Sequence, residues 1–253
     1  MTESRKGLER SSNVTCRDLD GLMRLLDNAD DGIIPSESLL RQINARVLKD
    51  LRPIRPLVSS RILLCGCAII FLSVVAVGAL LLGMNGWGVL SLVQRIIVFL
   101  TLAASAILLA ISMIRQMVPG SRHILAPAVL LVSILVLLMM VIAATFRPQP
   151  ESAFLVNGVM CMKNGLTYSM PAGTLLWLIL RRGAILYPRL TGAVAGGLAG
   201  LAGLSVLEIN CPNLNVFHIL AWHTGVVIIG SLGGAMLGAA VESIGRRRKY
   251  KGF

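Results

Sequence analysis

Long apolar runs, separated by short polar stretches, make up most of the chain from residue 62 onward. A helix needs about 20 apolar residues to cross the ~30 Å hydrocarbon core of a bilayer. Six runs reach or approach that length: Ile62–Met84, Ile96–Met113, Leu125–Phe146, Asn164–Leu180, Leu190–Leu207 and His223–Val241. The pattern therefore predicts an all-α, polytopic membrane protein with a six-helix transmembrane bundle.

Two features of these runs indicate how the helices pack. Glycine recurs at four-residue spacing in the fifth and sixth runs: Gly192, Gly196, Gly200, Gly230, Gly234 and Gly238. Small residues at this spacing allow helix backbones to approach closely in a membrane. The fourth run, Asn164–Leu180, is more polar than a lipid-facing helix, so we expect it to face the interior of the bundle.

The segment before the first run is amphipathic. It carries an apolar stripe at helical spacings of three and four, formed by Leu40, Ile43, Val47 and Leu51. A short helix of this kind cannot form a stable core alone, so the stripe needs either a protein groove or the membrane surface. The predicted domains are a helical segment over residues 1–61, a six-span domain over 62–245 and a basic tail over 246–253.

The charge distribution predicts the orientation in the membrane. The 253-residue chain has a formal net charge of +12 and 24 Lys and Arg residues. With a cytoplasmic N-terminus, six spans return the C-terminus to the cytoplasm, and only Arg95, Arg147 and Lys163 fall outside. Because Lys and Arg are enriched in cytoplasmic loops, both termini are predicted to be cytoplasmic. The basic residues are scattered among loops, so direct nucleic-acid binding is not expected.

Two of the five cysteines, Cys161 and Cys211, fall in loops that are predicted to face outward. An oxidising compartment would favour their pairing, but the sequence leaves a disulfide and two unrelated buried cysteines as alternatives. His218 follows Cys211 by seven residues, the spacing of one helix face. His223 lies about 140° round a regular helix from His218, so it is predicted to face elsewhere.

The same residues raise the question of a metal ion. Cysteine and histidine are ligands of soft and borderline metals, so Cys161, Cys211, His218 and His223 are candidates for a soft-metal site. The alternative is that both histidines are structural or interfacial. Trp222 is expected to anchor the helix end at the membrane interface. No other cofactor is expected.

Several motifs resemble the NrsF-type family. They run from "VNGVMCMKNG" through a basic turn and a glycine-rich span to a Cys-Pro and Trp motif, and "RPIRPL" and "VPGSR" precede them. The corresponding residues in this chain are Cys161, Arg181, Arg182, Gly183, Pro188, Cys211, Pro212 and Trp222. The resemblance extends over about residues 50–240. This chain departs from the family at His223, where the family often has tyrosine, and in its longer N-terminal segment.

Proteins of this family are inner-membrane anti-sigma factors of bacteria, which negatively regulate extracytoplasmic-function sigma factors. The resemblance therefore implies a sigma factor as the cytoplasmic partner and a multi-pass location in the inner membrane. It further implies that Cys161 and Cys211 are sensor thiols in a stress response, with His218, Trp222 and His223 associated with them.

A transporter or channel for a small solute or metal is the alternative function. Transporters usually carry ionisable residues at mid-membrane, and none of the six runs has one at its centre. An enzyme is not expected, because the sequence contains no Ser/His/Asp set, carboxylate pair or H-E-x-x-H motif.

Overall fold

The computed structural model describes residues 37, 41, 42, 44, 59–118, 125–181, 183 and 185–251. The chain divides into two compact units, Met1–Pro56 and Leu57–Phe253. In the first unit, Glu37 and Arg41 lie one helical turn apart and form an exposed ion pair of 2.9 Å. The predicted partner-binding residues lie outside the described part of the chain: Leu40, Ile43, Val47 and Leu51.

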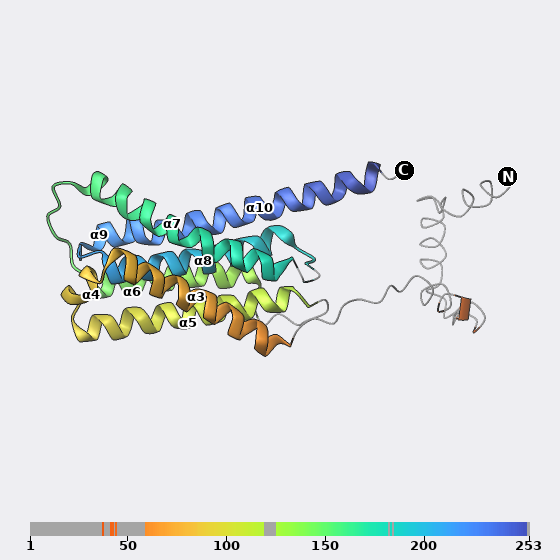
Figure 1. Ribbon diagram of the computed structural model, residues 1–253, viewed down its shortest axis with the longest axis horizontal. Coiled ribbons are helices and arrows are strands. Elements are labelled where there is room, and N and C mark those ends of the chain that lie inside the picture. The colour runs from red at the N-terminus through yellow and green to blue at the C-terminus, as the bar shows by residue number, and fades with distance from the viewer. Residues whose placement is uncertain are drawn as a thin grey trace, which may run out of the picture. The chain divides into compact units, whose positions relative to one another are not determined.

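The second unit is a bundle of helices that lie side by side (Figure 1). The long helices are α3 (Ser60–Leu82), α5 (Leu92–Gln116), α6 (Pro127–Thr145), α7 (Phe154–Leu180), α8 (Pro188–Asn210) and α10 (Thr224–Lys251). The short segments are α4 (Asn85–Val89), α9 (Val216–His218) and the π-helical turn η3 (Ile219–His223). The described residues contain helices and no strand, which confirms the prediction of an all-α chain.

Five helical segments in the described part of the chain are long and apolar enough to cross a membrane. They are Ser60–Leu82, Leu92–Gln116, Pro127–Thr145, Pro188–Asn210 and Val216–Ile244. The predicted run Asn164–Leu180 lies within α7, which is more polar and is not one of the five. The structure thus supports five spans, and a sixth crossing remains a prediction.

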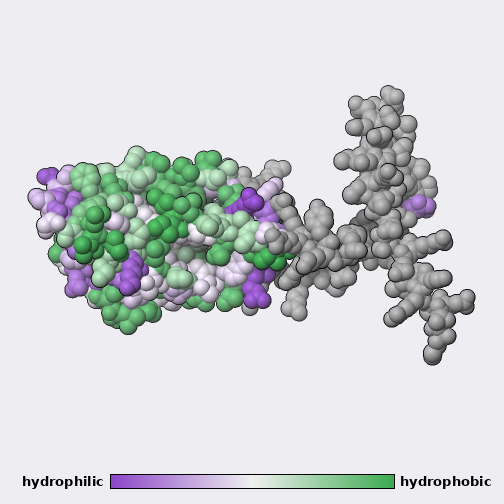
Figure 2. Space-filling model, turned by 90° about the horizontal axis from the view of Figure 1, so that it is seen from above, coloured by the Kyte–Doolittle hydropathy of each residue, from purple (hydrophilic) through white to green (hydrophobic). Residues whose placement is uncertain are grey.

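Large apolar side chains cover the outside of the second unit. Leu80, Leu81 and Met236 are 84%, 72% and 73% exposed, which would be costly in water and is normal in contact with lipid. Figure 2 shows apolar residues over the flank of this unit and hydrophilic residues gathered mostly toward its two ends. The distribution is that of a membrane protein.

Helix α8 is the central element of the bundle. In its most apolar stretch 83% is buried, against 17–44% for the other four candidate spans. A Cβ atom at Gly192 or Gly196 would collide with the backbone of α10, at Gly234 and Gly230 respectively. The predicted close packing of the two glycine stripes is therefore confirmed.

Helix α7 begins at Phe154, ten residues before the predicted fourth run. The predicted run starts after Lys163 because a charged residue interrupts the apolar pattern. Lys163 is exposed, however, and a long lysine side chain can extend its charged end toward the membrane surface. The prediction that Cys161 lies in a loop is therefore wrong, since Cys161 belongs to α7.

Candidate functional site

The loop that carries Cys211 is shaped by the residues around it. Helix α8 ends at Asn210, with Cys211 as its C-cap, because Pro212 disfavours helical geometry in the residue before it. The Asn213 side chain then accepts a hydrogen bond from Asn215 N at 2.9 Å. In the same way, Asn215 caps α9 by accepting from Phe217 N at 3.2 Å. These two asparagine side chains therefore satisfy backbone groups that the turn exposes.

A second anchor fixes the beginning of this loop. The Asn210 side chain donates to the carbonyl oxygen of Leu82 at 2.6 Å, at the end of α3. Leu82 is the last residue of α3, and the C-cap residue Gly83 has a positive φ of 84°. The Cys211 loop is thus attached to the neighbouring helix end as well as to its own helix.

Glu151, in the connection between α6 and α7, is the polar centre of the neighbouring loops. Its carboxylate accepts from the Asn213 side chain at 2.7 Å and from the Asn215 side chain at 3.3 Å. It also lies 3.1 Å from Nδ1 of His218. The Arg147 carbonyl accepts from Val216 N at 3.2 Å. The two connections are therefore joined into one structure at this end of the bundle.

His218 and His223 lie on the same side of the chain, so the prediction that they face different sides is wrong. The reason is the π-helical turn over Ile219–His223. In a π-helix the hydrogen bonds run between residues five apart, which places residues at that spacing one above the other. The two imidazole rings are edge to face, with centroids 5.5 Å apart.

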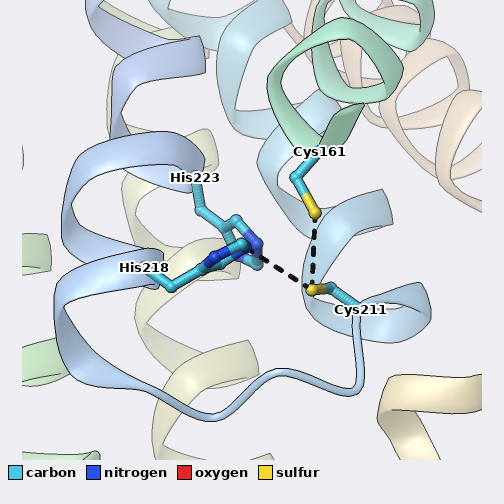
Figure 3. Close-up of side chains that lie close together, drawn as sticks. All are labelled: Cys161, Cys211, His218 and His223. Carbon is cyan, nitrogen blue, oxygen red and sulfur yellow. Dashed lines mark hydrogen bonds between the residues drawn. The ribbon is translucent and has the colours of Figure 1, made fainter. Parts of the chain in front are cut away.

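Four side chains converge at this end of the bundle (Figure 3). Cys161 Sγ and Cys211 Sγ are 3.5 Å apart, although fifty residues separate them in sequence. Cys211 Sγ lies 3.8 Å from Nε2 of His218. One ligand atom from each of Cys161, Cys211, His218 and His223 lies within 4.8 Å of the others. All are buried except Cys161, which is half-buried.

Each histidine holds a carboxylate through the nitrogen that points away from the thiols. His218 Nδ1 contacts Glu151, and His223 Nδ1 lies 2.8 Å from Glu208 Oε1. The side chains of Glu208 and His223 are only 3% and 1% exposed. Nε2 of His223 is buried and has no hydrogen-bond partner within the described residues.

The environment of Cys211 favours its protonated form. The pKa of the Cys211 thiol is raised above its ordinary value, first by the hydrogen bond with the Cys161 thiol and then by burial. Burial alone disfavours a thiolate because the charge loses its hydration. These two effects outweigh the contacts with His218 and His223, which lower the pKa of Cys211.

Trp222, in η3, packs against α7. Its ring lies 5.7 Å from the Phe154 ring, and a Cβ at Gly158 would overlap the indole. Its Nε1 is buried without a hydrogen-bond partner among the described residues. Trp222 therefore supports the turn that carries His223, and Gly158 provides the space for it.

Glu151 is the member of the site that sequence reasoning missed. Its signal was weak, because it is one acidic residue in the short stretch "RPQPESA". Its partners Asn213, Asn215 and His218 lie more than sixty positions away, and only the fold brings them close.

Comparison with known proteins identifies the family. The model of the family described as NrsF, negative regulator of sigma F, matches residues 48–241. The chain therefore belongs to the NrsF family, whose description is that of negative regulators of a sigma factor. No curated protein and no solved structure is significantly similar to the chain.

Proposed function

We propose that this protein holds an extracytoplasmic-function sigma factor at the inner membrane of a bacterium and releases it when the Cys161–Cys211 pair reacts. The family match supports the regulatory part of this proposal. The apolar outer surface supports a membrane location. In this scheme the stripe formed by Leu40, Ile43, Val47 and Leu51 is the docking surface for the sigma factor, and no enzymatic step is involved.

The distribution of charge supports an outward-facing thiol pair. At the end of the bundle opposite the cysteines lie Arg61, Arg115, Arg181 and Arg189. The sequence "RRRK" follows at the end of α10. The end with Cys161 and Cys211 carries Arg95 and Arg147, and Lys163 lies in the half of α7 that leads to it. Since the more basic end of a membrane protein faces the cytoplasm, the thiols would face outward, toward an oxidising compartment.

The observation that carries the sensing proposal is the 3.5 Å separation of the two sulfur atoms. Two thiols at this distance can form a disulfide by giving two electrons to an external oxidant and releasing two protons. The sulfur atoms would then move about 1.5 Å closer. Such a movement draws α7 toward the C-terminal end of α8.

The packing of α7 against α8 leaves little room to absorb that movement. A Cβ at Gly203 of α8 would collide with the Gly165 carbonyl and the Ser169 hydroxyl of α7. On its other side α8 packs closely against α10 through the glycine stripes. Closely packed interfaces shift as units rather than deform continuously, so the movement can reach the basic end of the helices.

Substitution of the thiols tests this proposal. Cys161→Ser, Cys211→Ser and the double variant should each abolish the response of sigma-dependent transcription to an oxidant. The double variant should add little to either single one, because the thiols act as a pair. Cys65→Ser is the matched control, since Cys65 is exposed on α3. An unchanged response in all three variants would show that these cysteines only fill space.

A further inference from the structure

We propose that Cys161, Cys211, His218 and His223 bind one divalent metal ion of the zinc class in tetrahedral geometry. The ligand atoms are the two sulfur atoms and Nε2 of each imidazole. They come from α7, from the C-cap of α8, from α9 and from the π-helical turn. This site is a property of the chain whether or not the protein holds a sigma factor.

The separations of the ligand atoms fit an ion of this size. A tetrahedral ion bound at about 2.0 Å to nitrogen and about 2.3 Å to sulfur keeps its ligand atoms about 3.3 to 3.8 Å apart. The Sγ–Sγ distance of 3.5 Å and the Cys211 Sγ–His218 Nε2 distance of 3.8 Å already lie in this range. The widest separation in the cluster is within 4.8 Å, so small side-chain rotations complete the site.

The two carboxylates prepare the histidines for a metal. Histidines that bind metals commonly donate their other N–H to a carboxylate, which fixes the tautomer and the ring orientation. Glu151 at Nδ1 of His218 and Glu208 at Nδ1 of His223 have this arrangement. Both histidines then turn a lone pair at Nε2 toward the thiols. The buried Nε2 of His223, which no described residue satisfies, would gain its partner.

Charge also favours a cation in the cluster. Two adjacent thiolates, of which that of Cys211 is buried, would be costly without compensation, and a divalent cation neutralises both. Sulfur and imidazole donors select zinc-like and softer ions, whereas magnesium and calcium prefer oxygen ligands. Because Cys161 is only half-buried, an ion can reach the cluster from its side.

The test uses the full-length protein, purified in detergent under reducing conditions with an affinity tag that contains no histidine or cysteine. Co²⁺ is the spectroscopic probe, since its charge-transfer band reports thiolate ligands and its visible bands report tetrahedral geometry. We expect one Co²⁺ per chain with both signatures, and displacement of Co²⁺ by Zn²⁺. The Cys65→Ser control should give the same spectrum.

The histidine variants decide between four ligands and a simple thiol pair. His218→Asn and His223→Asn place an amide where Nδ1 was, so each can still contact its glutamate, but neither has an Nε2. Each should weaken Co²⁺ binding by at least roughly tenfold, the scale on which metal sites respond even to indirect changes. Cys161→Ser and Cys211→Ser should reduce the charge-transfer band. A melting temperature close to that of the parent shows that the metal-free variant is folded.

Two results would overturn the proposal. The first is a folded parent protein that binds no Co²⁺ or Zn²⁺ under reducing conditions. The second is binding that is lost in the cysteine variants but unchanged in both histidine variants, which would mean a thiol pair without imidazole ligands. Because these measurements read the metal directly, they do not depend on whether transcription responds to Cys161 and Cys211.

Discussion

At the scale of single residues, Glu151 and Glu208 determine how the two imidazoles are presented. Both carboxylates are largely buried, with exposures of 8% and 3%. A buried carboxylate is costly unless it is paired and hydrogen-bonded, and each of these is held by a histidine Nδ1. Their position behind the histidines makes them positioning residues for the proposed metal site rather than ligands.

We predict that Glu151→Gln and Glu208→Gln each weaken Zn²⁺ binding by roughly 10- to 100-fold, because an outer partner of a ligating histidine contributes on that scale. Competition against a chelating dye measures the affinity. Glu242→Gln is the control, since Glu242 pairs with Arg189 at the opposite end of the bundle at 2.9 Å. Equal affinities in all three variants would mean that the carboxylates serve only the fold.

The residues of the site differ in how far the sequence could predict them. The proximity of Cys161 and Cys211 was predictable in part, because the predicted topology puts both residues at the same end of the bundle. The capping roles of Asn213 and Asn215 were predictable because they are local. The contact between Glu151 and His218 was not, since it joins two connections that lie 67 positions apart.

At the scale of elements, the π-helical turn brings the two histidines together. The hydrophobic pattern could not predict the wider π-helical turn, because Ile219, Leu220 and Ala221 suit an α-helix equally well. The pattern also did not predict the ten-residue extension of α7, since Lys163 interrupts the apolar run. At the π-helical turn, packing contributes to the geometry, because Trp222 fits over Gly158. In the extension of α7, Asn157 donates to Glu151 at 3.3 Å.

The crossing of α8 and α10 gives a prediction at the same scale. Gly196→Ala should destabilise the protein by about 1–3 kcal/mol, the usual cost of overpacking, because its Cβ would meet the Gly230 carbonyl. Gly233→Ala is the matched control: it lies in α10 with open space around it. It should be neutral or stabilise by up to about 1 kcal/mol through helix propensity. Unfolding in detergent, followed by circular dichroism, compares the two.

If Gly196→Ala unfolds at the same point as the parent, the two helices cannot approach as closely as the structure indicates. A large loss of stability in Gly233→Ala would instead mean that this face of α10 has a partner outside the described residues. Either result would argue against the proposal that a movement at Cys161 and Cys211 is transmitted through α8 and α10 to the basic end of the bundle. The expected pattern, a loss only for Gly196→Ala, supports that route.

At the scale of the whole molecule, most of the fold could be predicted from hydropathy, and the orientation was predicted from charge. Five of the six predicted apolar runs coincide with the five helical segments that are long and apolar enough to cross a membrane. The central position of α8 could be anticipated only from its glycine content, since its apolar stretch has the lowest hydropathy of the five, 1.7. Helix α7 is the exception, because its polar residues leave the sixth crossing undecided by composition.

The orientation and the crossing of α7 can be tested together with reporter fusions. If α7 spans the membrane, a reporter that is active only in the cytoplasm should work when fused at Arg181 and fail when fused at Gln149. Asn213 should behave like Gln149, and Phe253 like Arg181, because α8 and α10 each reverse the side.

A polar helix such as α7 is tolerated in the membrane because Gly165 and Ser169 face α8 rather than lipid. A backbone that is hydrogen-bonded within its own helix can also cross hydrocarbon. Activity at both Gln149 and Arg181 would mean that α7 does not cross and that Cys161 faces the cytoplasm, which would remove the basis for an outward-facing thiol pair.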